Sequence, residues 1–555
     1  MKRFRYTWFV SCRFLPMFTA WAGREAIAGV AAFALSIALF CGNASAATIS
    51  SLADKHHQRE RAEQATRDGD YELAEKLFRE RLTKHAGDTA AQLGLSFVLL
   101  KQRKLQDAFD MAARVLAVEP TSARAHALVG AALLAAGDFR QSSAQFHMAL
   151  SFDPDEALAV AGLAMIDFYD NRMNASLVGL RRAVSIAPNE PDYWFNLAQA
   201  AARNEHYGEA ADAYERFLRI TPRADAERRA RIHGLIDFLR YLGAQRGLNL
   251  ASGASRVEVP FELVKNRPVV KARVNGEKEP LRFVIDTGSG MCVISSAAAE
   301  RLHLHAVARG GMARAVGGGG RFEIVYGFLS SLQLNEARIE NVPVYIRQFY
   351  NDQEPVDGYI GLSVLSRYLT SIDYGVRVLT LVRSGERTNY ETAEESGGIE
   401  MPVRTTSSGF RSGEIHVEGV SKPLNFIIDT GASISVVSES LATREEMGRY
   451  ALKPRLKVYG AAGVAEDVQM VLLPHLTLGS HTSANVTAVV LDMASINETT
   501  GFEQSGIIGG NVLANFRITF DFQRGVMWFE PATAPVTRQH GDVTRAVSQK
   551  AKKGL

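Results

Sequence analysis

The second half of the chain repeats one unit, and this duplication constrains the fold more than any other feature of the sequence. The segment PLRFVIDTGS at Pro280–Ser289 returns as PLNFIIDTGA at Pro423–Ala432, so that equivalent residue numbers differ by 143. A second element, Tyr359-Ile360-Gly361, returns as Ile507-Ile508-Gly509 with an offset of 148. The second copy therefore carries about five extra residues, which we place between Leu491 and Ser505.

Both copies have the texture of β-strands. From residue 257 to 529, short runs rich in Val, Ile and Phe alternate with Gly and Asn turns. In each copy an aspartate follows such a run and precedes Thr-Gly, so that a strand ends in a tight turn that glycine permits. A single Asp-Thr-Gly is most simply a surface turn. Two of them, with the same flanks and the same downstream element, make Asp286 and Asp429 candidate catalytic residues.

Together these motifs resemble the pepsin and retroviral-protease superfamily of aspartic proteases. The resemblance rests on the two Asp-Thr-Gly loops, a glycine-bearing hairpin in each copy and the two apolar–apolar–Gly elements. It implies a two-lobed domain in which each copy supplies half of one active site. It implies that Asp286 and Asp429 are catalytic, and that their loops are supported by Thr287, Gly288, Ser289, Thr430, Gly431 and Ala432. It implies that the flaps over the substrate cleft include Val316, Gly317, Gly318, Tyr459 and Gly460. It also implies a structural place behind the site for Ile360, Gly361, Ile508 and Gly509.

Such a site needs two carboxyl groups that share one proton, because like charges in contact cannot both ionise at low cost. The ionised aspartate takes a proton from a water molecule that attacks the peptide carbonyl, and the protonated one donates to the carbonyl oxygen. The resemblance implies that Thr287 and Thr430 brace the pair from beneath. The copies differ at Ser289 and Ala432. Since a hydroxyl can stabilise a neighbouring carboxylate, we hypothesise that Asp286 is the ionised partner.

The first half of the chain has a helical repeat with a regular period. Prolines fall at residues 120, 154, 188 and 222, a small residue precedes each by twelve positions, and large residues recur at Phe78, Phe146, Leu180 and Tyr214. This pattern, with its period of about 34 residues, resembles the tetratricopeptide repeat. It implies five stacked helix pairs, a capping helix near Ala224–Leu242 and a concave face that binds a peptide or a partner protein. The alternative is a scaffold without a ligand.

The N-terminal residues are typical of an export signal. Basic residues precede an apolar run from Ala26 to Gly42, and the small-residue pattern Ala44-Ser45-Ala46 follows. We expect cleavage after Ala46, and the alternative is an uncleaved anchor, for which seventeen apolar residues is short. In both cases the rest of the chain is exported to the periplasm, and it touches a membrane only if the segment is retained.

Composition excludes several classes of function. A net charge of +3 argues against a nucleic-acid-binding protein. Three cysteines, at 12, 41 and 292, exclude a disulfide-stapled scaffold and a cysteine-ligated metal centre. No histidines have metal-ligand spacing, so we expect no metal and no cofactor. The four glycines at Gly317–Gly320 precede no Gly-Lys-Ser/Thr, so they are no phosphate loop. They are either a mobile flap or a loop without a role.

We therefore predict a multidomain protein, in which an all-α tetratricopeptide-repeat superhelix precedes an all-β, duplicated, two-lobed aspartic-protease-like domain. The expected boundaries are 1–46 for the signal or anchor, 55–243 for the repeats with their capping helix, 244–255 for a linker, 256–386 and 398–530 for the two lobes, and 531–555 for a disordered tail. The expected function is an exported aspartic endopeptidase whose repeats bind the substrate or a partner protein. The alternative is a catalytically silent peptide-binding or adaptor protein.

Overall fold

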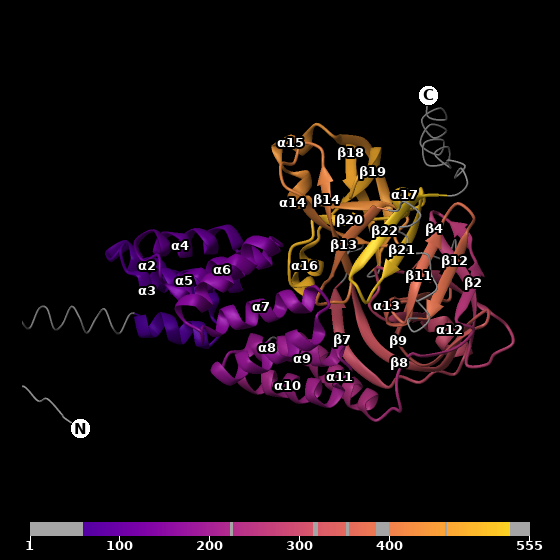
Figure 1. The fold of residues 1–555 in the computed structure, drawn as a ribbon, viewed down its shortest axis with the longest axis horizontal. Coiled ribbons are helices and arrows are strands. Elements are labelled where there is room, and N and C mark those ends of the chain that lie inside the picture. Colours follow the sequence, from indigo (N-terminus) through magenta and orange to yellow (C-terminus); the bar gives the residue numbers. More distant parts are fainter. Residues whose placement is uncertain are drawn as a thin grey trace, which may run out of the picture.

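The computed structural model describes residues 59–221, 226–314, 320–350, 355–383, 399–460 and 463–532. Figure 1 shows a helical stack, formed by the first part of the chain, beside a two-lobed β domain formed by the rest. The expected signal or anchor (1–46), the residues of the expected tail from 533 onward and the flap residues Val316, Gly317 and Gly318 lie outside the described residues. No helix within the described part of the chain is long and apolar enough to span a membrane.

The helical stack is built from successive helix pairs, and the prolines mark where the second helix of a pair ends. The first pair consists of a helical segment at 59–67 and α2. Helices α4, α6 and α8 end two residues before Pro120, Pro154 and Pro188, respectively, because proline disfavours the helical conformation of the residue before it. The helices are α2 (Tyr71–Lys84), α3 (Thr89–Lys101), α4 (Leu105–Val118), α5 (Ala123–Ala135), α6 (Phe139–Phe152), α7 (Ala157–Tyr169), α8 (Met173–Ile186), α9 (Pro191–Arg203), α10 (Tyr207–Ile220) and α11 (Ala226–Gly243).

Small residues let these helices approach closely. Ala74, Ala108, Ser142, Ser176 and Ala210, which recur once in every repeat, are completely buried. The large residues of the pattern fill the spaces that glycines leave. A Cβ atom on Gly162 would lie 2.1 Å from the ring of Phe146, so this ring can pack against α7 only because the residue there is glycine. The period of the repeat therefore reflects the packing between helices.

The β domain consists of two similar lobes. The first contains β2 (Arg256–Pro260), β3 (Glu262–Val264), β4 (Arg267–Val274), β5 (Leu281–Ile285), β6 (Cys292–Ser295), α12 (Ser296–Arg301), β7 (Ala308–Arg314), β8 (Arg321–Leu334), β9 (Ala337–Arg347), β10 (Gly358–Ile360), α13 (Leu362–Leu365), β11 (Tyr368–Asp373) and β12 (Val378–Arg383). The second contains β13 (Ile399–Thr405), β14 (Arg411–Val417), β15 (Leu424–Ile428), β16 (Ser435–Ser438), α14 (Glu439–Ala442), α15 (Glu445–Gly448), β17 (Ala451–Gly460), β18 (Gly463–Leu478), β19 (His481–Leu491), α16 (Ala494–Thr500), β20 (Gly506–Ile508), α17 (Gly510–Leu513), β21 (Phe516–Asp521) and β22 (Val526–Pro531).

One sheet joins the lobes. Strands β11 and β21 pair antiparallel, with Ile372 opposite Ile518, and the sheet continues outward as β13-β22-β21-β11-β12-β2. Ile372 and Ile518 are completely buried in a core that extends through both lobes. The two copies of the duplicated unit are therefore held by backbone hydrogen bonds as well as by apolar packing.

The expected linker between the helices and the lobes, 244–255, contains a short strand. Within 244–255, residues Leu250–Gly253 form β1, which pairs antiparallel with β9. The small residues there form a strand because the edge of β9 offers unpaired backbone groups that β1 can satisfy. Gly253 has φ of 90°, and a Cβ atom on it would lie 2.0 Å from the carbonyl oxygen of Glu336. Glycine at this position thus permits a close approach as well as a turn.

The stack contacts the first lobe through its last helix. Helix α11 packs on β7, the first strand of the hairpin expected to be a flap. Gly234 is the point of closest approach, since a Cβ atom there would lie 2.0 Å from the carbonyl oxygen of Arg309. The ring of Phe238 stacks on that of Tyr326 in β8, with 4.2 Å between their centroids, and Arg231 donates to the carbonyl of Met312 at 2.9 Å.

The stack contacts the second lobe through the residues that distinguish the second copy. The extra residues form α16 and a turn that ends at Phe502 (Figure 1). The ring of Phe502 is completely buried between Phe139 and Tyr169 of the repeats, with edge-to-face contacts at 4.8 and 5.1 Å. The backbone N–H of Glu503 donates to the carbonyl of Ala135 at 2.9 Å. The insertion predicted from the two offsets is thus a docking element for the repeats.

Candidate active site

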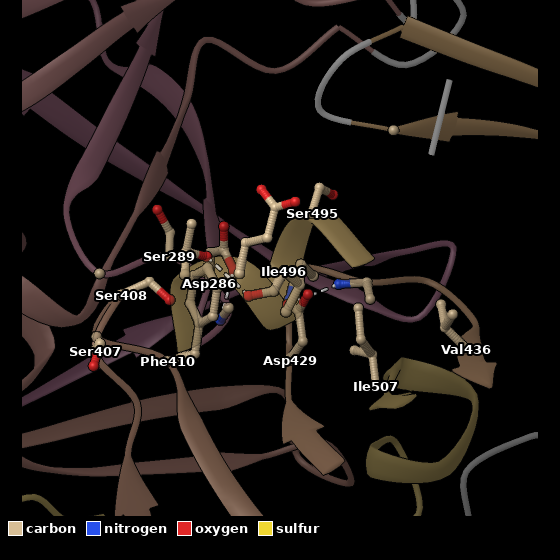
Figure 2. Close-up of a pocket in the computed structure, with 18 of the residues that line it drawn as sticks. Asp286, Ser289, Ser407, Ser408, Phe410, Asp429, Val436, Ser495, Ile496 and Ile507 are labelled. Carbon is tan, nitrogen blue, oxygen red and sulfur yellow. Dashed lines mark hydrogen bonds between the residues drawn. The ribbon is translucent and has the colours of Figure 1, made fainter. Parts of the chain in front are cut away.

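Asp286 and Asp429 meet where the two lobes join. Asp286 follows β5 and Asp429 follows β15, and their carboxyl groups hydrogen-bond to each other (Figure 2). The backbone N–H of Asp286 donates to the carbonyl of Ile360, and that of Asp429 donates to the carbonyl of Ile508, both at 3.0 Å. Each aspartate is therefore held at the end of its strand by the neighbouring apolar–apolar–Gly element.

That element lies between the two strands that flank each Asp-Thr-Gly loop. Strand β10 runs parallel to β5 and antiparallel to β6, while β20 has the same relation to β15 and β16. Ile360 and Ile508 are completely buried. A Cβ atom on Gly361 or Gly509 would lie within 2.7 Å of a carbonyl group in the loop that follows the aspartate. Ile360, Gly361, Ile508 and Gly509 thus lie behind the aspartates, where glycine lets the backbone pass closely.

Thr287 and Thr430 connect the two loops beneath the carboxyl groups. The backbone N–H of each donates to the hydroxyl oxygen of the other, at 3.1 Å in both directions. The hydroxyl of Thr287 donates to the carbonyl of Ile428 at 2.8 Å, and that of Thr430 to the carbonyl of Ile285 at 2.7 Å. Both side chains are completely buried. These four hydrogen bonds all cross from one lobe to the other.

The glycines after the threonines make room for the opposite aspartate. A Cβ atom on Gly288 would lie 2.3 Å from the carboxyl carbon of Asp429, and one on Gly431 would lie 2.6 Å from Oδ1 of Asp286. Real Cβ atoms do not approach so closely, so any other residue would push the carboxyl groups apart. Each glycine also donates its backbone N–H to the aspartate of its own loop, at 2.9 Å for Gly288 and 2.7 Å for Gly431.

The surroundings raise the pKa of both carboxyl groups, and that of Asp286 further. Burial is the largest cause for both, and the charge of Asp429 and the hydrogen bond with it add to the rise at Asp286. Asp429 accepts two backbone N–H bonds, from Gly431 and from Ala432 at 3.1 Å, which favour its ionised form, whereas Asp286 accepts one. Both the larger rise at Asp286 and the extra backbone N–H bond at Asp429 favour the form in which Asp286 carries the shared proton.

This assignment reverses the hypothesis drawn from Ser289. The hydroxyl of Ser289 donates to the carbonyl of Met291 at 2.7 Å, within its own turn. The position is nevertheless asymmetric, because the equivalent Ala432 contributes a backbone N–H to its carboxylate. A backbone amide gives no signal in the residue type, so the comparison of serine with alanine could not reveal this asymmetry.

The carboxyl pair lines a cavity of about 3000 Å³. Ser289 and the loop with Ser408 and Phe410 lie on one side of the pair, and Val436 and Ile507 lie on the other (Figure 2). Tyr459 and Gly460, near the described end of the second hairpin, also line this cavity, and Tyr459 is 45% exposed. The two hairpins, β7–β8 and β17–β18, occupy equivalent places in the lobes.

Two arginines near the carboxyl pair were not among the candidate residues. Arg347, at the end of β9, and Arg267, at the start of β4, both line the cavity. The charge of Arg347 lowers the pKa of Asp286, and that of Arg267 lowers the pKa of Asp429, so each partly opposes the effect of burial. In the second lobe Leu491 occupies the strand position that corresponds to Arg347. Alignment of the two copies could have revealed this difference.

Cys292 lies beneath the first loop. It is buried and accepts the backbone N–H of Gly361 at 3.4 Å. Burial raises the pKa of its thiol to about 11, so it stays protonated at neutral pH. In the part of the chain that the structure describes, no group of three or more His, Cys, Asp or Glu side chains could hold a metal ion.

Comparison with known proteins assigns both parts of the chain. Residues 270–364 and 413–512 each match the profile of the aspartyl protease family, so the profile recognises the two copies of the unit separately. Residues 65–132 and 191–224 match tetratricopeptide-repeat profiles. The chain thus contains a duplicated aspartyl-protease-like domain after tetratricopeptide repeats, as the motifs predicted.

Among curated proteins, the chain is 28% identical over 121 residues to Protein DDI1 homolog 2 of Xenopus tropicalis, and 27% identical over 124 residues to Protein DDI1 homolog 1 of Mus musculus. Each match covers 22% of this chain and less than a third of the relative, 29% and 28% respectively.

Among solved structures, the aspartic proteinase from Irpex lacteus matches 51% of this chain and 99% of its own, with 12% identity and a TM-score of 0.35. The repeat protein TTC0263 from Thermus thermophilus matches 33% of this chain and 98% of its own, with 18% identity and a TM-score of 0.29.

Proposed function

We propose that this chain, with its aspartyl-protease-like domain and tetratricopeptide repeats, is an aspartic endopeptidase in which Asp429 acts as general base and Asp286 as general acid. One observation carries the proposal. A carboxyl group from each lobe is hydrogen-bonded to the other, and the pair opens into a cavity several times larger than the ~300–1,000 Å³ of a small-molecule pocket. The substrate is therefore a protein or a long peptide.

The pair of carboxyl groups can perform hydrolysis in two steps. In the first, Asp429 takes a proton from water as the water oxygen bonds to the peptide carbon, and Asp286 donates its proton to the carbonyl oxygen. In the second, Asp429 passes its proton to the amide nitrogen as the C–N bond breaks. Asp286 then recovers a proton from the diol, and the products are an amine and a carboxylic acid. The cycle returns both groups to their starting protonation states.

The other residues of the site hold this arrangement. Thr287 and Thr430 fix the distance between the loops, Gly288 and Gly431 allow the carboxyl groups to meet, and the strands that end at Ile360 and Ile508 hold the aspartates from behind. Positioned groups of this kind lower the reorganisation needed in the transition state. Tyr459 and Gly460 contribute to the wall of the cleft from the second hairpin.

The test is cleavage of a mixed peptide library by the chain from Ala47 onward, beside the Asp286→Asn and Asp429→Asn variants, with and without pepstatin. Cleavage that each variant and the inhibitor abolish would support the mechanism and give the sequence preference. A folded protein that cleaves no peptide between about pH 3 and 8, the range in which paired carboxyl groups titrate, would contradict it.

We also propose that the chain is exported. The support is the basic segment, apolar run and Ala44-Ser45-Ala46 pattern at the N-terminus. Expression in a Gram-negative host, followed by fractionation and measurement of the intact mass, tests the proposal. A periplasmic product that begins at Ala47 would support it, and a full-length cytoplasmic product would contradict it.

A further inference from the structure

The cavity at the carboxyl pair extends over the repeats. Its walls include Asp286 and Asp429, but also residues from α3, α5, α7, α9 and α11, the first helices of the successive pairs and the capping helix. The inner face of the helical stack and the cleft of the β domain therefore form one continuous space, which we call the chamber. Docking of α11 on β7, and of Phe502 between Phe139 and Tyr169, places the stack in this position.

The walls of the chamber carry an excess of basic side chains. Among the described lining residues nine are Lys or Arg and five are Asp or Glu, and two of those five are the catalytic pair. Two further acids, Glu190 and Asp192, bind Lys101 at 2.7 and 2.5 Å. Lys457 is paired with Glu466 at 2.9 Å, and the other basic residues come from both the repeats and the β domain. Positive charge thus lies along the chamber from the repeats to the carboxyl pair, where Arg267 and Arg347 stand.

Two arginines of the repeats have hydrogen-bond donors that no described residue satisfies. Arg103 follows α3 and Arg203 ends α9, and both lie near the hydroxyl of Tyr169, whose pKa their charges lower against the larger effect of burial. Nη2 of Arg103 and Nη1 of Arg203 are buried without a partner within the described residues. A buried N–H without an acceptor is unfavourable, so a ligand that brings carboxylate oxygens would satisfy both.

Aromatic rings lie among these charges. The guanidinium of Arg228 lies 5.4 Å from the centroid of the Phe195 ring, and both residues line the chamber. Tyr193 and Phe97 also line this part of the chamber. A surface that alternates cations with apolar rings suits an unfolded segment that carries both acidic and apolar side chains.

We propose that the inner face of the repeats is a second binding site for the substrate chain itself, and that it selects an unfolded polypeptide segment rich in Asp and Glu. The inference rests on the proposed peptidase function, because it places cleavage at the carboxyl pair and recognition on the repeats within one chamber. The acidic segment is a part of the substrate that is not cut. It raises the local concentration of the scissile bond at the catalytic pair.

The experiment uses the full exported chain and a fluorogenic core peptide chosen from the library. The core is extended at one end by a tail of about twelve residues, long enough to span ~40 Å when extended. Three tails of equal length are compared, built from Glu and Ser, Gln and Ser, or Lys and Ser, each attached at either terminus. The variant Arg103→Gln/Arg228→Gln removes two charges from the chamber, and Arg140→Gln removes an exposed charge that does not line it.

The expected result is that the acidic tail, at one terminus, raises kcat/KM about tenfold over the Gln/Ser tail, mainly through KM, which corresponds to about 1.4 kcal/mol. High salt and the double variant should remove this gain and leave cleavage of the bare core unchanged, whereas Arg140→Gln should keep it. Equal rates with all three tails, or faster cleavage with the basic tail, would overturn the inference while the peptidase function stands.

A binding measurement separates the two proposals. Fluorescence anisotropy of the labelled tails on the full-length Asp286→Asn variant needs no catalysis. If the wild-type chain cuts nothing and this variant still binds the acidic tail with the same dependence on Arg103 and Arg228, the peptidase proposal fails and the acidic-peptide site stands. Tighter binding of a single-stranded oligonucleotide than of the acidic tail would overturn the choice of a polypeptide ligand.

Discussion

Thr287 and Thr430 donate their backbone N–H groups to each other's hydroxyl oxygens at the same distance, 3.1 Å, although they come from different lobes. Each hydroxyl also donates to a carbonyl of the opposite strand. The geometry of the carboxyl pair therefore depends on the relative position of the lobes. A displacement of one lobe would break all four hydrogen bonds at once.

The first prediction concerns this buried connection. Thr430→Val keeps the shape of the side chain but removes the hydroxyl, so that the N–H of Thr287 and the carbonyl of Ile285 lose their partner. At ~1–3 kcal/mol for each of the two buried groups, we expect a loss of about 2–6 kcal/mol in the free energy of unfolding. Thr430→Ser retains the hydroxyl and should cost about 1 kcal/mol for the lost methyl group. Urea denaturation measures both, and equal losses would contradict the role of the hydroxyl.

The second prediction follows from the raised pKa of Asp286. Because folding raises this pKa, the native state binds more protons than the unfolded chain once the pH exceeds the ordinary aspartate value of about 4. The contribution of Asp286 to stability is therefore favourable at low pH and falls as the pH rises through its raised value. Asparagine cannot ionise, so Asp286→Asn should unfold at a higher temperature than the wild type near pH 7. The difference should vanish near pH 3.

Asp429→Asn provides the comparison for this prediction, because folding raises the pKa of Asp429 less. Its stabilisation near pH 7 should be smaller than that of Asp286→Asn. A larger effect at Asp429, measured by calorimetry over the same range of pH, would place the shared proton on the other aspartate.

The third prediction compares Ser289 with Arg347. Since the hydroxyl of Ser289 is bound to the carbonyl of Met291, Ser289→Ala should leave both limbs of the pH–rate profile in place. The charge of Arg347 lowers the pKa of Asp286, so Arg347→Gln should move both limbs to higher pH. The readout is kcat/KM for one peptide across the pH range. An upward shift of the acid limb in Ser289→Ala would restore the hypothesis drawn from the sequence.

The fourth prediction concerns the contact between α11 and β7. A Cβ atom on Gly234 would lie 2.0 Å from the backbone of Arg309, so Gly234→Ala should push the helix from the hairpin and cost about 1–3 kcal/mol. A Cβ atom on Gly208 in α10 would have no other atom within 4 Å. Gly208→Ala should thus be neutral or stabilise by up to about 1 kcal/mol. Thermal unfolding distinguishes the two, and limited proteolysis should cut the β7–β8 hairpin faster in Gly234→Ala alone.

Much of the fold could be predicted because its signals are local. The repeats have a regular period because each contains one small residue, such as Ala74, that is completely buried where two helices touch. The two copies of the β unit could be aligned because Asp-Thr-Gly and the Ile-Gly elements each lie in a short segment with a fixed backbone role. The insertion of about five residues was visible in the difference between two offsets.

The arrangement of the parts could not be predicted in the same way. The contact of Gly234 with Arg309 joins residues that are far apart in the sequence, and a glycine in a helix has several explanations. The place of the proton depends on backbone N–H groups, which every residue except proline carries. The special role of Arg347 is the part of the site that could have been predicted, because an arginine in the first copy aligns with Leu491 in the second.

The helical stack lies beside the two-lobed β domain (Figure 1), and it contacts a different element in each lobe, β7 in the first and the segment with α16 and Phe502 in the second. A cleft with twofold symmetry accepts a peptide in either direction, because reversal exchanges equivalent walls. Under the proposal that the repeats hold the substrate, the substrate chain crosses the carboxyl pair in one polarity only. The span between the two contacts then determines how far from its anchored segment a chain is cut. Under the proposed function the molecule works as a molecular ruler, whose products have a defined length.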